Sequence, residues 1–261
     1  MSFSPNAPST AARRTLRNIV RAALSVGLSV AVFISVQLVV YGLTQSAAWT
    51  VAAGAASTLP LYWLTNALAA SAAENTTSNS WRLPRPRRAV LLVAVLIPVW
   101  LAGQTLAILI ADTWPAAADA YQRQTEQLAL APESVTLLLA LVAAPVGEEL
   151  LMRGILYRQL RKTLRLSVFT SAIVSAGVFA GLHGSLLQAG AVLLLGVFLA
   201  LAYEATGNIL VPIVLHGLFN VMSTFVPAEW VAPLASLPFV IMLWLATILA
   251  LVLMPAFGRR L

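Results

Sequence analysis

The sequence predicts an all-α, polytopic integral membrane bundle of about eight transmembrane helices. Of its 261 residues, 60% are hydrophobic and only 10% are charged, and the mean hydropathy is +0.87. A soluble domain carries roughly 25% charged residues, so this chain could not cover a water-facing surface. Its apolar runs also reach the length of about 20 residues that a membrane-spanning helix needs.

The individual spans follow from long runs that are mostly free of charge. We expect spans at 22–43, 48–73, 89–111, 134–160, 205–228 and 230–258, and two more within 166–203. The stretch 166–203 is too long for one span, and Gly184-Ser185 just after His183 is the expected break between its two helices.

Basic residues occur in four groups, which eight spans would place on one side of the membrane. The groups are Arg13, Arg14, Arg17 and Arg21; Arg82, Arg85, Arg87 and Arg88; Arg158, Arg161, Lys162 and Arg165; and Arg259 and Arg260. Because cytoplasmic loops are enriched in Lys and Arg, we expect both termini in the cytoplasm. The acidic segment 112–133 should then lie on the opposite side.

These patterns divide the chain into three regions. We expect a polar cytoplasmic tail at 1–14, two N-terminal transmembrane helices with a basic loop over 15–88, and a membrane domain over 89–261. The third region contains all the polar residues that suggest chemistry.

Ionisable residues inside the spans mark the candidate site, because each is costly to place in the bilayer. Glu148 and Glu149 fall in one span, and the chain's two histidines, His183 and His216, fall in two others. Lipid-facing positions would be prohibitive for these groups, so we expect the three helices to share an interior site.

Helical spacing suggests a role for each polar residue. Glu149 and Arg153 are four residues apart and can pair within one helix, which favours a structural role. Glu148 is rotated by about 100° from Glu149, so it stays available as a general base for water. His216 and Asn220 are also four apart, and both could donate hydrogen bonds to a developing oxyanion.

The sequence also bears on protein classes other than a protease with a Glu/His site. The chain has no cysteine, which excludes cysteine nucleophiles and thiolate metal sites, and it has no Ser-Gly or Gly-Asp dipeptide of rhomboid-type or presenilin-type proteases. The rival is a non-catalytic immunity or scaffold protein, or a transporter that uses Glu and His as a proton relay. Asn220 beside His216 distinguishes a protease from a proton relay, because an oxyanion site needs that donor and a relay does not.

Three motifs carry a resemblance to a known family. The run Glu148-Glu149-Leu150-Leu151-Met152-Arg153 resembles the EExxxR motif of the CPBP family, which comprises intramembrane proteases related to the CaaX prenyl endopeptidase and to bacterial Abi proteins. Phe179 to His183 resembles its FxxxH motif, and His216 to Asn220 resembles its HxxxN motif. The order and spacing fit over about 136–223, which would be the catalytic core.

The resemblance implies a mechanism for this chain. Glu148 would act with His183 to polarise a water that attacks the scissile carbonyl, and His216 and Asn220 would stabilise the oxyanion. Glu149, with Arg153, would hold the helix and support Glu148.

A metal is the open alternative for this mechanism. Zinc could bind to Glu148, His183 and His216 with water in the fourth position. No HExxH sequence is present to place two ligands on one helical turn, so glutamate-activated water without a metal is the preferred form.

The depth of the two histidines sets a condition on the interpretation. His216 should lie nearer the cytoplasmic end of its span, whereas His183 should lie deeper. A shared site therefore requires a tilted or late-starting helix before His183, or a site well inside the membrane.

Partners and location follow from charge and composition. The net charge of +7 is explained by a basic rim facing anionic lipid headgroups, so we expect no nucleic-acid partner. The Ala- and Arg-rich composition with a single Lys suggests a bacterial, multi-pass plasma-membrane protein. Its substrate should be a membrane protein or peptide rather than a CaaX tail, and the sequence gives no indication of oligomeric state.

Overall fold

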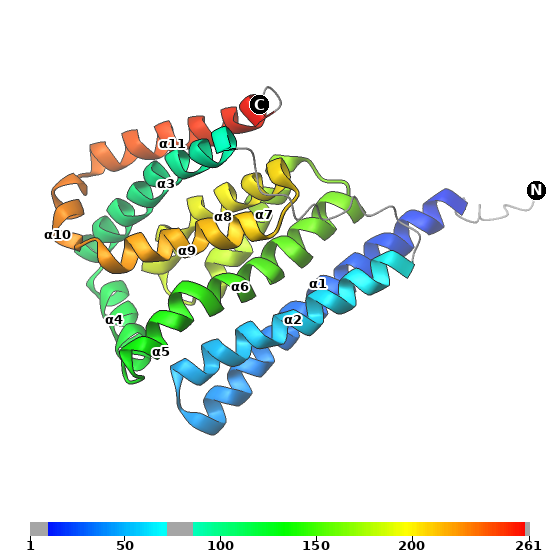
Figure 1. Cartoon of the computed structure of the whole chain (residues 1–261), viewed down its shortest axis with the longest axis horizontal. Coiled ribbons are helices and arrows are strands. Elements are labelled where there is room, and N and C mark those ends of the chain that lie inside the picture. Colours follow the sequence, from blue (N-terminus) through cyan, green and yellow to red (C-terminus); the bar gives the residue numbers. More distant parts are fainter. Residues whose placement is uncertain (1–9, 72–85, 259–261) are drawn as a thin grey trace, which may run out of the picture.

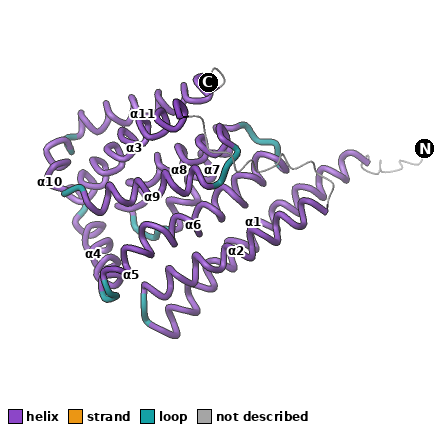
Figure 2. The backbone as a smooth tube through the Cα atoms, viewed as in Figure 1, coloured by secondary structure: helices purple, strands orange, loops and turns teal. Residues whose placement is uncertain are grey.

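A computed structural model describes residues 10–71 and 86–258, and these residues form helices joined by short connections (Figures 1 and 2). No strand occurs within these two ranges. The predicted all-α bundle is therefore confirmed. The basic residues Arg82, Arg85, Arg259 and Arg260 lie outside the described residues.

The helices follow the chain in the order shown in Figure 1. They are α1 (Thr10–Thr44), α2 (Ala47–Ser71), α3 (Pro86–Thr113), α4 (Pro115–Ala129), α5 (Glu133–Leu138), η1 (Leu139–Ala143), α6 (Ala144–Glu149), η2 (Leu150–Tyr157), η3 (Gln159–Thr163), α7 (Val168–Leu182), α8 (Leu186–Thr206), α9 (Leu210–Phe225), α10 (Ala228–Val231), η4 (Ala232–Leu234) and α11 (Leu237–Gly258).

Five stretches of the described residues are long and apolar enough to cross a membrane: α1, α3, the continuous helix from α5 to η3, α8 and α11. A sixth is formed if α9 and α10, which are bent by 94° at their junction, count as one span. Helix α2 forms where a span was expected but is not among these, and α7 is a shorter apolar helix. The number of eight spans stays a prediction.

Two element boundaries differ from those expected. Helix α1 begins at Thr10, so the last residues of the expected tail 1–14 are helical. Helix α3 begins at Pro86, within the expected basic loop, because proline lacks only an N–H that the first helical turn leaves unpaired. The acidic segment 112–133 is largely the polar helix α4, which has no buried residue.

The continuous helix from α5 to η3 does not have the regular α geometry that its sequence suggested. Its segments η1, η2 and η3 are π-helical, whereas α5 and α6 between and before them are α-helical. Wide π turns of this kind are frequent at functional sites. The two glutamates lie at the end of α6, directly before η2.

Helix α8 forms the centre of the bundle and packs against α3, α7, α9 and α11 (Figure 1). Small residues permit these close approaches. A Cβ atom added to Gly196 of α8 would lie 2.8 Å from the Cβ of Ala176 in α7, and one added to Gly103 of α3 would lie 2.2 Å from the Ala191 carbonyl oxygen. Backbones that approach through small residues are typical of packed membrane helices.

The N-terminal helices α1 and α2 form a hairpin beside the α5–η3 helix (Figure 1). Contact is closest at Gly147, where an added Cβ would lie 2.5 Å from the Cα of Ala55 in α2. Further along, the Arg158 guanidinium donates a hydrogen bond to the Asn66 side chain of α2. The hairpin therefore supports the helix that carries the two glutamates.

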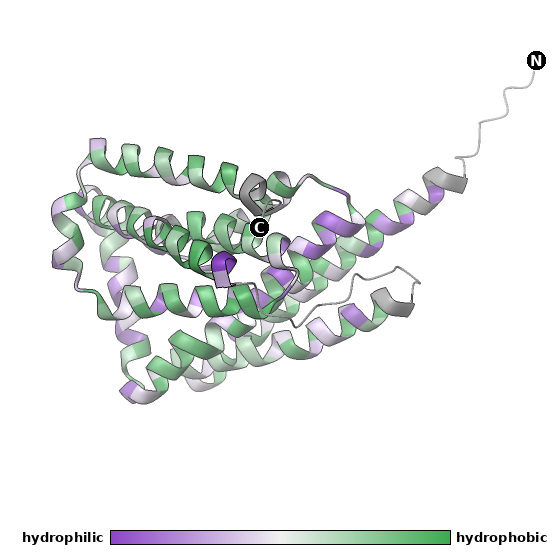
Figure 3. Cartoon of the chain, turned by 45° about the horizontal axis from the view of Figure 1, so that its top comes forward, coloured by the Kyte–Doolittle hydropathy of each residue, from purple (hydrophilic) through white to green (hydrophobic). Residues whose placement is uncertain are grey.

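Figure 3 shows that hydrophobic residues predominate along the helices, with many of the hydrophilic residues toward helix ends. At the C-terminal end of α8, Arg161 pairs with Glu204 at 2.6 Å, and Arg88 donates to the Ala205 carbonyl oxygen at 3.1 Å. Basic residues from two separate parts of the chain thus meet at one end of α8. This arrangement agrees with their expected placement on one side of the membrane.

Candidate active site

A buried ion pair anchors the candidate site. The Arg153 Nη1 atom donates to Glu149 Oε1 at 2.8 Å, and neither side chain is exposed. Arg153 Nη2 also donates to the carbonyl oxygen of Gly196 at 2.6 Å, which ties the pair to α8. The pairing expected from the four-residue spacing is confirmed, although Arg153 lies in the π-helical segment η2.

His216 of α9 joins this pair through its Nδ1 atom, which lies 2.9 Å from Glu149 Oε1. An ionised carboxylate can only accept, so the Nδ1 atom carries the proton in this contact. Carboxylates that bind one ring nitrogen in this way fix the tautomer and orientation of the imidazole. Glu149 therefore binds His216, a partner that the resemblance did not imply, and its support of Glu148 stays a prediction.

Glu148 lies near the other ring nitrogen, Nε2, of the same imidazole. Its Oε2 atom is 3.7 Å from His216 Nε2, and its side chain is 26% exposed, whereas that of His216 is 3% exposed. This separation exceeds the reach of a direct hydrogen bond but suits a contact made through water. Glu148 takes no part in the Arg153 pair, as its rotation around the helix predicted.

Phe179 lies between the two histidines. Its ring centroid is 4.8 Å from that of His183 and 5.6 Å from that of His216, both in edge-on geometry. The Arg153 guanidinium carbon lies 5.3 Å from the same ring. The packing of Phe179 therefore brings His183, His216 and Arg153 around one ring.

Helix α7 begins at Val168, two residues into the expected apolar stretch, and His183 caps its C-terminal end. That the two histidines share one depth in the bilayer stays a prediction. The His183 Nδ1 atom lies 2.8 Å from the Phe179 carbonyl oxygen, which can only accept. The proton is therefore on Nδ1, and the Nε2 atom of the neutral ring is an acceptor. Within the two described ranges, no hydrogen bond or ion pair joins His183 to Glu148.

Asn220 makes a contact that the sequence did not predict. Its Nδ2 atom donates to the carbonyl oxygen of Ala140 in η1 at 2.7 Å. That carbonyl lacks a helical donor, because the Ala144 N–H bonds Leu139 and residue 145 is a proline without an N–H. The Asn220 amide thus compensates for Pro145, and one of its two N–H groups remains for another acceptor.

The side chains do not form a ready metal site. Among residues 10–71 and 86–258, no group of three His, Asp or Glu side chains is close enough to hold a metal ion. In the set considered from sequence, His216 uses Nδ1 on Glu149, and His183 uses Nδ1 on a backbone carbonyl. These bonds leave Nε2 of each ring for another contact, so zinc at Glu148, His183 and His216 stays the alternative, and no step below depends on a metal.

A second polar cluster was missed by the sequence analysis. Tyr157 donates to Glu204 Oε2 at 2.9 Å, and Arg161 holds the same carboxylate while donating to the Leu166 carbonyl oxygen at 2.6 Å. These bonds join the end of the glutamate-bearing helix to α8 and to the connection before α7. Only the unusual placement of a glutamate near the end of an apolar run could have indicated it.

Comparison with known protein families supports the resemblance seen in the motifs. Residues 130–222 match the family model described as type II CAAX prenyl endopeptidase Rce1-like. The match contains Glu148, Glu149, Arg153, His183 and His216, and also Asn220. No curated protein and no solved structure matches the chain.

Proposed function

We propose that this chain, whose residues 130–222 form an Rce1-like CAAX endopeptidase domain of the CPBP family, cleaves a peptide bond of a membrane-associated protein or peptide. The observation that carries the proposal is the approach of Glu148 Oε2 to His216 Nε2 at 3.7 Å. A carboxylate and an imidazole held by Glu149 thus lie close together, which supports a shared reaction centre. Membrane helices on every side of the site point to a substrate that is itself in or on the bilayer.

Glu148 is the general base of the proposed reaction. It takes a proton from a water molecule as the water oxygen attacks the scissile carbonyl carbon, and the carbonyl oxygen becomes an oxyanion. Collapse of the oxyanion then breaks the C–N bond while Glu148 passes the same proton to the leaving nitrogen, so that a carboxylic acid and an amine are released. Among the two adjacent glutamates, Glu148 suits this role because its carboxylate is 26% exposed, whereas Glu149 is fully buried and shared between Arg153 and His216.

His216 stabilises the oxyanion in this scheme. Glu149 holds the ring through Nδ1, and the imidazolium form of His216 would donate its Nε2–H to the developing charge. The remaining N–H of Asn220 is the second donor. His183, whose Nε2 atom is an acceptor, assists Glu148 in orienting the water.

The test compares the protein termini in membranes of cells that express the wild type or Glu148→Gln at equal levels. The substitution keeps the size of the side chain but removes the base, and loss of a general base typically lowers the rate by about 10²–10⁴-fold. New termini should appear with the wild type and disappear with Glu148→Gln. Glu126→Gln, which alters an exposed side chain on α4, is the matched control and should leave the termini unchanged.

The alternative is a transporter or scaffold that uses the same residues as a proton relay. If wild type and Glu148→Gln gave the same termini while the substitution still changed a cellular phenotype, proteolysis would be refuted and the relay favoured. Asn220 then provides a further distinction, because an oxyanion site needs its amide and a proton relay does not.

A further inference from the structure

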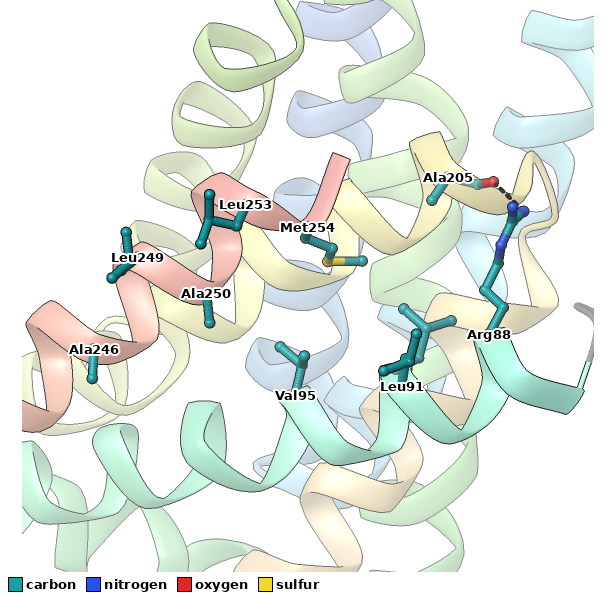
Figure 4. Close-up of a pocket in the computed structure, with 10 residues that line it drawn as sticks. Arg88, Leu91, Val95, Ala205, Ala246, Leu249, Ala250, Leu253 and Met254 are labelled. Carbon is teal, nitrogen blue, oxygen red and sulfur yellow. Dashed lines mark hydrogen bonds between the residues drawn. The ribbon is translucent and has the colours of Figure 1, made fainter. Parts of the chain in front are cut away.

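An apolar groove runs between α3, α8 and α11, away from the candidate active site. Its volume is about 470 Å³, and its lining residues include neither Glu148 nor His216. Figure 4 shows the groove with Arg88 at one end and Leu249 and Ala246 toward the other. The volume falls within the range of about 300–1,000 Å³ that is typical of small-molecule sites.

Small and large side chains alternate along α11 to form the groove. Ala246 and Ala250, four residues apart, leave the space, while Leu249 and Leu253 form a rim on the same helix. The rim residues Leu249 and Leu253 are 59% and 43% exposed, and Leu91 on α3 is 45% exposed. In a bilayer, this exposed apolar rim opens the groove to lipid chains.

Arg88 is the sole residue with a polar side chain among those that line this groove. Its Nη1 atom donates to the Ala205 carbonyl oxygen at 3.1 Å, and this bond holds the guanidinium at the groove's end (Figure 4). The neighbouring Arg87 is exposed at the start of α3. The groove therefore combines an apolar interior suited to an acyl chain with one cation, Arg88, at its end, where the membrane-spanning helix α3 begins.

We infer that this groove binds an anionic phospholipid of the bilayer, with one acyl chain between α3 and α11 and the phosphate at Arg88. Arginine is suited to phosphate because its planar guanidinium donates two parallel hydrogen bonds. A neutral or purely aliphatic occupant would not use this arginine. The inference concerns lipid binding and does not rest on the proposed peptidase activity.

The test is native mass spectrometry of the full chain, released from detergent and titrated with phosphatidylglycerol or with phosphatidylcholine of the same acyl chains. The wild type should bind phosphatidylglycerol more tightly. One arginine near an anionic headgroup contributes an interaction that corresponds to about fivefold in binding. Arg88→Gln should therefore weaken phosphatidylglycerol binding by about fivefold, and Arg88→Lys should retain most of the preference.

A second variant tests the groove itself. Ala250→Leu leaves every charge in place but fills the hollow, so it should weaken the binding of both lipids. Arg123→Gln, which removes an exposed charge from α4 in the acidic segment, is the matched control and should change neither affinity. Equal binding of the two lipids by the wild type would refute the arginine-phosphate contact. Unchanged binding by Ala250→Leu in a folded protein would refute the groove as the acyl-chain site.

Discussion

Replacement of Asn220 by leucine should destabilise the fold by about 1–3 kcal/mol, because it leaves the Ala140 carbonyl oxygen without a donor. The Asn220 amide donates to this oxygen at 2.7 Å from a helix 80 residues away in sequence. Pro145 is the reason that the carbonyl needs this donor, since it occupies the position whose N–H would close a π turn. The cost should therefore depend on Pro145.

The dependence can be measured in a double-mutant cycle. Pro145→Ala supplies an N–H to the helix, so Asn220→Leu should cost at least about 1 kcal/mol less in the Pro145→Ala background. The free energy of unfolding would be followed by tryptophan fluorescence as mixed micelles are titrated with sodium dodecyl sulfate. Gln104→Leu, which removes a side-chain bond to Ser223 on the surface of the bundle, is the control.

Two results separate this reasoning from its alternatives. Gln104→Leu should cost the same in both backgrounds, because it shares no partner with Pro145. If Asn220→Leu also cost the same in both, the amide would not be compensating for the proline, and its contact with Ala140 would be incidental. Peptidase activity is a separate readout, because the proposed oxyanion contact uses the other N–H of Asn220.

Three further predictions follow from the buried contacts. Arg153→Met should destabilise the protein by about 3–5 kcal/mol in the same unfolding titration, because it leaves Glu149 buried without its cation. Arg161→Met, at a partly exposed ion pair, should cost about 1 kcal/mol or less. Equal losses of stability would contradict the role of burial. Gly147→Ala should lower stability by about 1–3 kcal/mol because its Cβ meets the Ala55 backbone, while Gly177→Ala, which has open space, should be neutral or stabilising. Incubation with a chelator should leave peptide cleavage unchanged, and inhibition that zinc reverses would establish a metal requirement.

The matched family region covers 130–222, yet the structure extends the site's support beyond it. Helix α2 packs on Gly147, and the Arg158 side chain bonds Asn66 of the same helix. The first two helices, which looked featureless in sequence, therefore brace the helix that carries Glu148. A variant that removes them is expected to disturb the candidate site.

What the sequence determined by itself are the properties that depend on neighbours along the chain. The apolar runs dictate helices because backbone in a bilayer must satisfy its hydrogen bonds internally. The Glu149–Arg153 pair follows from a separation of one helical turn, and Glu148 turns away from that pair for the same local reason. The three polar motifs could likewise be assigned to one site, because lipid cannot accommodate them separately.

Only the tertiary structure decided which groups meet across helices. Glu149 binds His216 over a separation of 67 residues, and Asn220 reaches the Ala140 carbonyl over 80. No periodic pattern in the sequence predicts either contact, because each depends on the position of α9 along the helix that carries Pro145. The edge-on contact of Phe179 with His216 and the hollow along α11 are likewise set by packing. Local sequence specifies which side chains are available, but the depth and rotation of packed helices specify their partners.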